Sequence, residues 1–183
     1  ILKEKVGSLT EQQKKFLEIS YKNLLKLGKN IDNLLDLAEI GIRKEAYAFE
    51  PVDLVKVIQF SCSTVEPLAK EYQIGLETQL PAEPLTIDGV ADKLDQLFDN
   101  LLTNAIKYNK PGGGEVHSKI SFVDQTQQYC MIEVRDSGLG ISKENQEKMF
   151  QKFFRVSDHA EKVQGTGLGL VIAKRIVEAH GGE

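Results

Sequence analysis

The sequence predicts a protein of the α/β class, α+β type, in which helices stack on one face of a sheet and a long amphipathic helix comes first. Helical and strand patterns occur in turn along most of the chain, without the regular β-α alternation of a doubly wound parallel sheet. Residues 1–49 carry helical periodicity alone, and the pattern breaks at Glu50-Pro51 because proline disfavours helix in the residue before it. We therefore expect two domains, 1–49 and 50–183.

The N-terminal segment carries the signals of a helix that begins near Thr10. Thr10 and Gln13 have capping-box spacing, in which each side chain can satisfy a free backbone N–H group of the other residue. A stripe then recurs in steps of three and four at Leu17, Ser20, Leu24, Leu27, Ile31, Leu34 and Ala38. One helix cannot bury this stripe alone, so it must pack on another helix. Ordinary core packing and dimerisation both fit the pattern.

Beyond the boundary the periodicity predicts further helices and strands. The segment 109–114, Asn-Lys-Pro-Gly-Gly-Gly, marks a helix stop. We expect helices over 52–71, 92–108, 143–150 and 168–179, and strands over 74–80, 116–123 and 129–135.

Composition limits the partners and the compartment. The net charge of −4 argues against a general nucleic-acid binder, and no apolar run is long enough to span a membrane. Cys62 and Cys130 are far apart in the sequence and have no neighbouring Cys or His in the spacing of a zinc site or a disulfide framework. A cytoplasmic location is the default expectation, which leaves open whether a longer parent protein is anchored in a membrane.

The first motif with chemical content lies in the predicted helix 92–108. Asn100, Asn104 and Lys107 are spaced four and three apart, so they project near one another on a helix. Two amide oxygens can bind a hard cation without cancelling its charge, and the lysine adds a positive charge for phosphates. Alternatively, the three side chains only decorate an exposed helix face.

The second motif, Asp136-Ser-Gly-Leu-Gly-Ile141, follows a predicted strand. A carboxylate at a strand end can accept a hydrogen bond from an exocyclic amine, and Gly138 and Gly140 would let the backbone approach a flat ring closely. These features outline a purine site. A turn that uses Asp and Gly for their backbone preferences is the alternative.

Two further motifs follow. Phe150-Gln-Lys-Phe-Phe-Arg155 offers aromatic anchors and an arginine that could meet a phosphate, although the phenylalanines also suit a core. Gly165-Thr-Gly-Leu-Gly169 precedes a predicted helix, where free N–H groups and the helix dipole favour an anion. The spacing G-x-G-x-G differs from that of dinucleotide-binding folds, and no P-loop sequence occurs.

These four motifs, in this order, resemble those of the ATP-binding domain of sensor histidine kinases, a fold shared with gyrase-type and Hsp90-type ATPases. The resemblance covers the whole chain, since 34–41 is similar to the end of the dimerisation and phosphoacceptor helices of that family. It implies a two-layer sandwich with a mixed, mainly antiparallel sheet (the Bergerat fold). It also implies that residues 1–49 are a remnant of the helical domain and that the last strands of the family's sheet are missing beyond Glu183.

The resemblance also implies roles for individual residues. Asn100 and Asn104 would bind Mg²⁺, with Asn100 and Lys107 acting in catalysis on the ATP phosphates. Tyr108 would pack near the base or sugar, and Asp136 would accept from the adenine amino group. Arg155 and the residues up to Gln164 would form a lid over ATP. The other implied ATP contacts are Gly138, Gly140, Ile141, Gly165, Thr166, Gly167, Leu168 and Gly169, with packing as the alternative for Leu168.

The resemblance implies an enzyme that transfers the γ-phosphoryl group of ATP to a histidine and then to an aspartate of a response-regulator receiver domain. Hydrolytic relatives place a glutamate where Asn100 stands, and an amide cannot act as a base, so kinase activity is favoured over hydrolysis. His117, His159 and His180 lack the acceptor pattern of the family, and His180 suits a helix cap. The acceptor is therefore expected before Ile1, and a homodimer is expected through the N-terminal helix. A scaffold with a vestigial site and an ATP hydrolase remain as alternatives.

Overall fold

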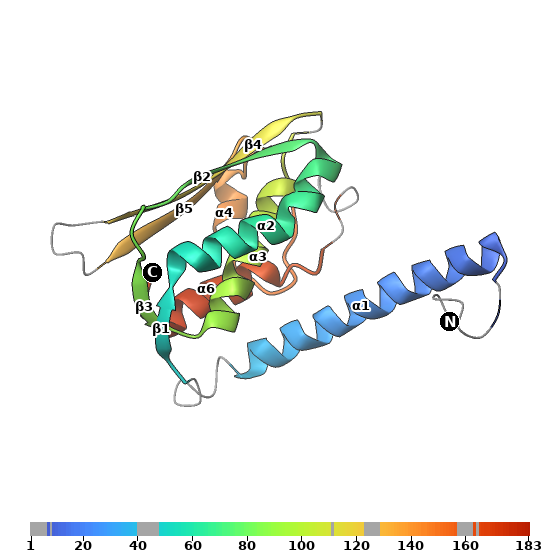
Figure 1. Cartoon of the computed structure of the whole chain (residues 1–183), viewed down its shortest axis with the longest axis horizontal. Helices are drawn as coiled ribbons and strands as arrows, with labels where there is room; N and C mark the ends of the chain where they lie inside the picture. Colours follow the sequence, from blue (N-terminus) through green and yellow to red (C-terminus); the bar gives the residue numbers. More distant parts are fainter. Residues whose placement is uncertain are drawn as a thin grey trace.

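The computed structural model describes residues 7, 9–39, 48–110, 112–122, 129–156, 163 and 165–183. A layer of helices covers one face of a three-stranded sheet, as Figure 1 shows. The helices are α2 (Leu54–Tyr72), α3 (Ala91–Lys107) and α6 (Gly169–Ala179), and the strands are β2 (Ile74–Gln79), β4 (Gly114–Phe122) and β5 (Cys130–Asp136). The predicted α+β architecture with helices on one face of the sheet is confirmed.

The sheet is mixed, with strand order β2-β4-β5. Strand β2 runs parallel to β4, and β4 pairs with β5 antiparallel. A separate antiparallel pair joins β1 (Glu50–Asp53) to β3 (Thr86–Gly89) and was not predicted. Both strands are four residues long, too short to show an alternating pattern.

Two predicted helix boundaries are wrong. The helix expected from residue 52 begins instead at Leu54, because Asp53 ends β1 and its Oδ1 accepts from the backbone N of Val55 at 3.1 Å as an N-cap. The helix expected over 143–150 is the single turn α4 (Lys143–Gln146), and residues 147–150 form turns. Ser142 caps that turn by accepting from the backbone N of Asn145.

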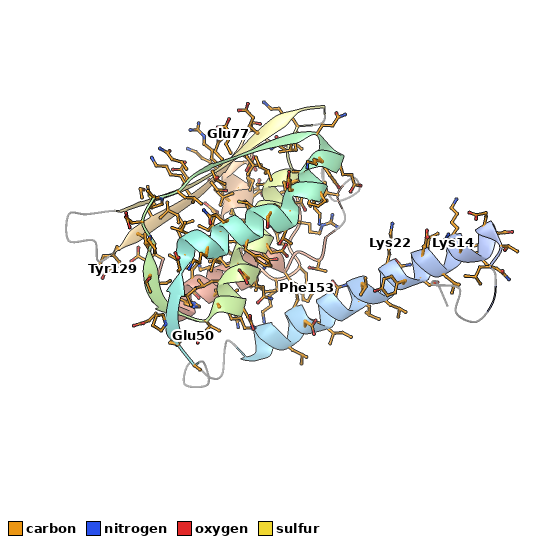
Figure 2. The ribbon with its side chains drawn as sticks, in the orientation of Figure 1. Lys14, Lys22, Glu50, Glu77, Tyr129 and Phe153 are labelled. Carbon is orange, nitrogen blue, oxygen red and sulfur yellow. The ribbon has the colours of Figure 1, made fainter. Side chains whose placement is uncertain are left out.

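Helix α1 (Glu11–Glu39) begins as the capping box predicts. The backbone N of Thr10 donates to Gln13 Oε1 at 3.0 Å, and the backbone N of Gln13 donates to Thr10 Oγ1 at 3.2 Å. The helix lies on the helical side of the body and extends far beyond it, and Figure 2 shows Lys14 and Lys22 on its outlying half. Within the described residues, no helix is long and apolar enough to cross a bilayer.

The core lies between the sheet and the helical layer, with α3 at its centre. Helix α3 contacts both α2 and α6, and its inner side carries Phe98, Leu102 and Ile106, each no more than 1% exposed. Val116 of β4 and Ile172 of α6 are completely buried against the same cluster. The elements that carry the predicted site motifs are therefore held by one continuous core.

Two histidines have defined surroundings, and His159 lies outside the described residues. His180 caps a carbonyl as predicted, since its Nδ1 lies 2.7 Å from the backbone O of Ile176. Its Nε2 accepts from the backbone N of Val90 at 3.1 Å, so one imidazole joins the end of α6 to the start of α3. His117 lies on the outer face of the sheet, 3.1 Å from Glu77, whose side chain Figure 2 shows projecting away from the helices.

We expect Phe98→Ala to lower the free energy of unfolding by about 3–5 kcal/mol, because the deleted ring leaves a cavity at the centre of the helical layer. The matched control is Phe60→Ala on α2, where the ring is 61% exposed and the expected change is within about 0.5 kcal/mol. Urea denaturation followed by circular dichroism measures both values. Equal losses in the two variants would contradict this description of the core.

Candidate functional site

One cavity of about 670 Å³ brings the predicted motifs together. Its walls come from α3, the turn after β5, the segment before α6, and α1. Of the predicted site residues, all but Gly138 and Leu168 line this cavity: Asn100, Asn104, Lys107, Tyr108, Asp136, Gly140, Ile141, Arg155, Gly165, Thr166, Gly167 and Gly169.

The amide pair of α3 lies directly against the start of α6. A Cβ at Gly169 would be 3.2 Å from Asn100 Oδ1 and 3.7 Å from Asn104 Nδ2. Asn100 Nδ2 is buried and finds no hydrogen-bond partner within the described residues. A buried donor without a partner is costly, so this atom is suited to an acceptor on a ligand, such as a phosphate oxygen. The glycine thus lets the start of α6 approach the amide pair closely.

The turn after β5 is compatible both with a purine site and with a purely structural turn, the two interpretations of its sequence. Asp136 Oδ1 accepts from the backbone N of Gly138 at 2.8 Å, as a turn-forming aspartate does. The second carboxylate oxygen remains for the cavity, which Asp136 also lines. A Cβ at Gly138 would lie 2.5 Å from Asp136 Oδ1 and 2.5 Å from the backbone O of Tyr108, so Gly138 permits the close approach without reaching the cavity.

A hydrogen-bond network that the sequence analysis missed holds this turn in place. Asn109, 7% exposed, donates from Nδ2 to the backbone O of Glu115 at 3.1 Å. Ser137 Oγ donates to Asn109 Oδ1 at 3.1 Å and accepts from the backbone N of Glu115 at 2.9 Å. The network joins the end of α3, the start of β4 and the residue after Asp136. In the sequence, Asn109 belongs to a helix stop and Ser137 is the variable position of a motif, so local spacing does not reveal their contact.

Apolar side chains form the wall near Asp136. Leu139 and Ile141 are 50% and 41% exposed, large fractions for side chains of this type, and both line the cavity with Met149. Apolar walls beside a single carboxylate acceptor suit a flat ring with an exocyclic amine. Ile141, an expected ATP contact, therefore lines the same wall as Leu139.

The phenylalanine and glycine motifs meet through their backbones. The N of Phe153 donates to the O of Gly167 at 3.1 Å, and a Cβ at Gly167 would lie 2.7 Å from the carbonyl carbon of Phe153. Both residues are left-handed, with φ of 65° and 70°. This contact joins the two segments that flank the predicted lid in the sequence. Arg155 lines the cavity, and its Nη2 donates to the backbone O of Val163, while residues 157–162 and 164 lie outside the described residues.

Leu168 is corrected as a predicted ATP contact. Its side chain is 2% exposed and belongs to the core cluster, so it packs beneath the segment that lines the cavity. Thr166 and Gly169 on either side do line the cavity. Four polar lining residues lie outside the predicted site: Asn30 and Asn33 on α1, and Asp99 and Thr103 on α3.

The side chains that line the cavity determine how it could hold a metal ion. No group of three His, Cys, Asp or Glu side chains that could hold an ion is found in the described parts of the chain. The cavity offers amide oxygens on α3, which supply few ligands and no charge. A cation at Asn100 and Asn104 would therefore have to share its coordination with the ligand's own phosphates, which is how Mg²⁺ is usually bound in phosphoryl-transfer sites.

The fold and the site together define a domain that binds a purine nucleotide. The chain belongs to the family of histidine kinase-, DNA gyrase B- and HSP90-like ATPases, whose family model matches residues 89–183. These residues carry all four motifs.

Sensor histidine kinases resemble the chain over more than this domain. Sensor histidine kinase WalK of Bacillus subtilis is 33% identical over 170 residues, which cover 92% of this chain and 27% of WalK. The structure of the mycobacterial sensor histidine kinase MprB is 30% identical with a TM-score of 0.60, and the match covers 73% of this chain and 81% of that one. Full-length ShkA in complex with AMPPNP is 23% identical with a TM-score of 0.78 over 97% of this chain and 36% of that one, which shows a shared fold.

We expect Gly167→Ala to destabilise the protein more than Gly181→Ala. Both glycines have a left-handed φ, of 70° and 78°, so both substitutions carry a backbone penalty of about 1–2 kcal/mol. The methyl group at 167 also meets the Phe153 backbone, whereas nothing lies within 4 Å at 181. Overpacking adds about 1–3 kcal/mol at 167, measured by urea denaturation. Equal losses would mean that the Phe153–Gly167 contact is absent in solution.

Proposed function

We propose that this chain binds Mg-ATP in the cavity and positions the γ-phosphoryl group for transfer to a histidine. The observation that carries this proposal is the convergence of the α3 amides, the Asp136 turn and the glycine segment before α6 on one cavity. Catalysis of phosphoryl transfer needs positioning and charge neutralisation more than a reactive protein group. The walls of this cavity offer those two contributions.

The base binds at the Asp136 end of the cavity. The free oxygen of Asp136 accepts from the adenine amino group, and Leu139 and Ile141 contact the ring. Tyr108 is held beside them, since its backbone O accepts from the N of Leu139 at 3.2 Å and its hydroxyl lies 3.8 Å from the Cβ position of Gly165. The purine thus fixes the direction in which the phosphates extend.

The phosphates extend toward the amide pair and the start of α6. Asn100 and Asn104 would hold Mg²⁺, which neutralises phosphate charge when bound. Lys107 adds a point charge from the same face of α3, and the first N–H groups of α6 face an anion favourably. Asn100 Nδ2 gains the acceptor that it lacks within the described residues.

Transfer to a histidine is favoured over hydrolysis because the phosphate end, as far as the described residues form it, offers no well-placed base. Asn100 is an amide, and the one carboxylate of α3 in the cavity wall, Asp99, accepts from Thr103 Oγ1 at 3.3 Å. His180 is bonded between α6 and α3, and His117 is on the far face of the sheet. We propose that the acceptor histidine belongs to a segment outside this sequence, and that a response-regulator aspartate receives the group next.

We also propose that α1 is the dimerisation segment of the enzyme and that residues 50–183 form its ATP-binding domain. The apolar side chains of α1 support this, since Leu24 is 66% exposed, Leu27 54% and Ile31 48%. Such a stripe on a helix that extends beyond the body suits a helical partner from a second chain.

We expect Asp136→Asn to weaken Mg-ATP binding at least tenfold. The substitution keeps the oxygen that accepts from Gly138 but replaces the other oxygen with an NH2 group. The hydrogen bond from the adenine amino group is then lost, and two donor groups face each other. Calorimetric titration measures the dissociation constant, and Asn104→Ala should lose affinity chiefly when magnesium is present. The matched control is Asp88→Asn, an exposed aspartate on β3. Unchanged affinity in both site variants would refute the site.

We expect the chain alone to release phosphate from ATP no faster than its Asn104→Ala variant, because none of the described residues is placed as a base that activates water. A coupled phosphate-release assay with saturating Mg-ATP measures both rates. Steady release that is lost in Asp99→Asn would instead identify a hydrolase with Asp99 as its base. A chain that Mg-ATP does not protect against thermal unfolding would favour a scaffold with a vestigial site, since a ligand of the native state must stabilise it.

A further inference from the structure

Among its described side chains, helix α1 turns Asn30, Asn33 and Leu25 toward the cavity and leaves most of its apolar side chains exposed. Among the α1 side chains that the structure describes, Asn33 alone is buried, at 7% exposed. Leu34 and Leu35, its neighbours, are 49% and 55% exposed. An amphipathic helix that packs only for stability buries its apolar stripe, so the burial of an asparagine indicates another role for this contact.

The buried asparagine faces the nucleotide cavity. Asn33 and Asn30, one helical turn earlier, form part of the cavity wall together with Asn100 and Asn104 of α3. Within the described parts of the chain, no hydrogen bond is found for the Asn33 side chain. The polar atoms of Asn33 are not among the fully buried atoms without a partner, unlike Asn100 Nδ2, so the Asn33 amide remains accessible to a ligand in the cavity that it lines.

The position of α1 favours the phosphate end of the cavity over the base end. Helix α1 contacts α6, which begins at Gly169 beside the amides of α3. Figure 1 shows α1 on the helical side of the body, away from the sheet whose strand β5 leads to Asp136. Phosphate oxygens at neutral pH only accept hydrogen bonds, and an asparagine Nδ2 offers two donors. The unsatisfied amide and the phosphate chain are thus complementary.

We propose that Asn33, assisted by Asn30, donates a hydrogen bond to the phosphate chain of bound ATP, so that the nucleotide joins α1 to the ATP-binding domain. The proposal rests on the function proposed above. Its consequence is a coupling between ligand and helix position, in which ATP holds α1 against the cavity and a nucleotide with fewer phosphates holds it less. Through this hydrogen bond, Asn33 makes the position of α1 depend on the number of phosphates in the bound nucleotide.

The test compares Asn33→Leu with Asn23→Leu in the whole chain. Leucine matches asparagine in size but has no donor, and Asn23 is an exposed asparagine of the same helix outside the cavity wall. We expect Asn33→Leu to weaken Mg-ATP binding roughly tenfold, Mg-ADP less, and adenosine not at all, as loss of one bond to a charged group implies. Asn23→Leu should bind all three as the unaltered chain does. Calorimetric titration gives the constants.

A second variant and a second readout separate a lost contact from a disturbed helix. Asn33→Asp keeps the shape but puts a negative charge against the phosphates, so it should weaken Mg-ATP binding more than leucine does and still leave adenosine binding unchanged. Hydrogen exchange of the α1 amides around residue 33 should slow on addition of Mg-ATP in the unaltered chain and in Asn23→Leu, but not in Asn33→Leu.

The outcomes are distinct. Unchanged Mg-ATP affinity in both Asn33 variants, with affinity lost in Asp136→Asn, overturns the α1 contact and leaves the proposed function standing. Equal loss for ATP, ADP and adenosine also overturns it, because the effect would then come from the shape of the cavity. Unchanged affinity in Asp136→Asn as well would refute the nucleotide site itself, and the α1 contact with it.

Discussion

The contact between α3 and the start of α6 is the constraint on which the site depends. Gly169 lies against Asn100 and Asn104, and a side chain there would occupy the space between the two motifs. The same two helices are joined at their other ends by His180, which bonds to Val90. Their shared core of buried apolar side chains keeps the two amides beside a helix N-terminus. A cation and phosphates could not be shared between the helices if either moved away.

The base end depends on a different kind of interaction, a small polar network. Asn109 and Ser137 hold the turn against the end of α3 and the start of β4, and Asp136 bonds to the backbone N of Gly138. One carboxylate oxygen therefore supports the turn while the other faces the cavity. The competing interpretations of this sequence, a turn or a purine site, describe the two oxygens of one side chain. Buried networks of this kind specify one geometry because each lost bond exposes an unsatisfied group.

The sequence could predict what depends on neighbours along the chain. The capping box of Thr10 and Gln13, the face shared by Asn100, Asn104 and Lys107, and the glycines before α6 all follow from local spacing. It could not predict what depends on tertiary packing. The pair β1–β3 is too short for a pattern, Leu168 packs beneath a motif whose other members line the cavity, and Asn109 reveals its partners only after β4 and β5 are in place. The place of Asn33 could not be predicted for the same reason, since α1 lies far along the chain from the α3 and α6 residues that it meets at the cavity.

The two sides of α1 differ in chemistry, one apolar and exposed and the other carrying a buried asparagine, so each side favours a different partner. The exposed leucines can lower their free energy only by contact with apolar surface, which another helix supplies. The Nδ2 group of the buried asparagine needs an acceptor, and the cavity that Asn33 lines is where phosphates would bind. A helix with one face reserved for another chain and the other for the nucleotide can carry information between them, because its position changes both contacts at once. Amphipathicity alone predicts the first partner, whereas the second requires the position of α1 in the structure.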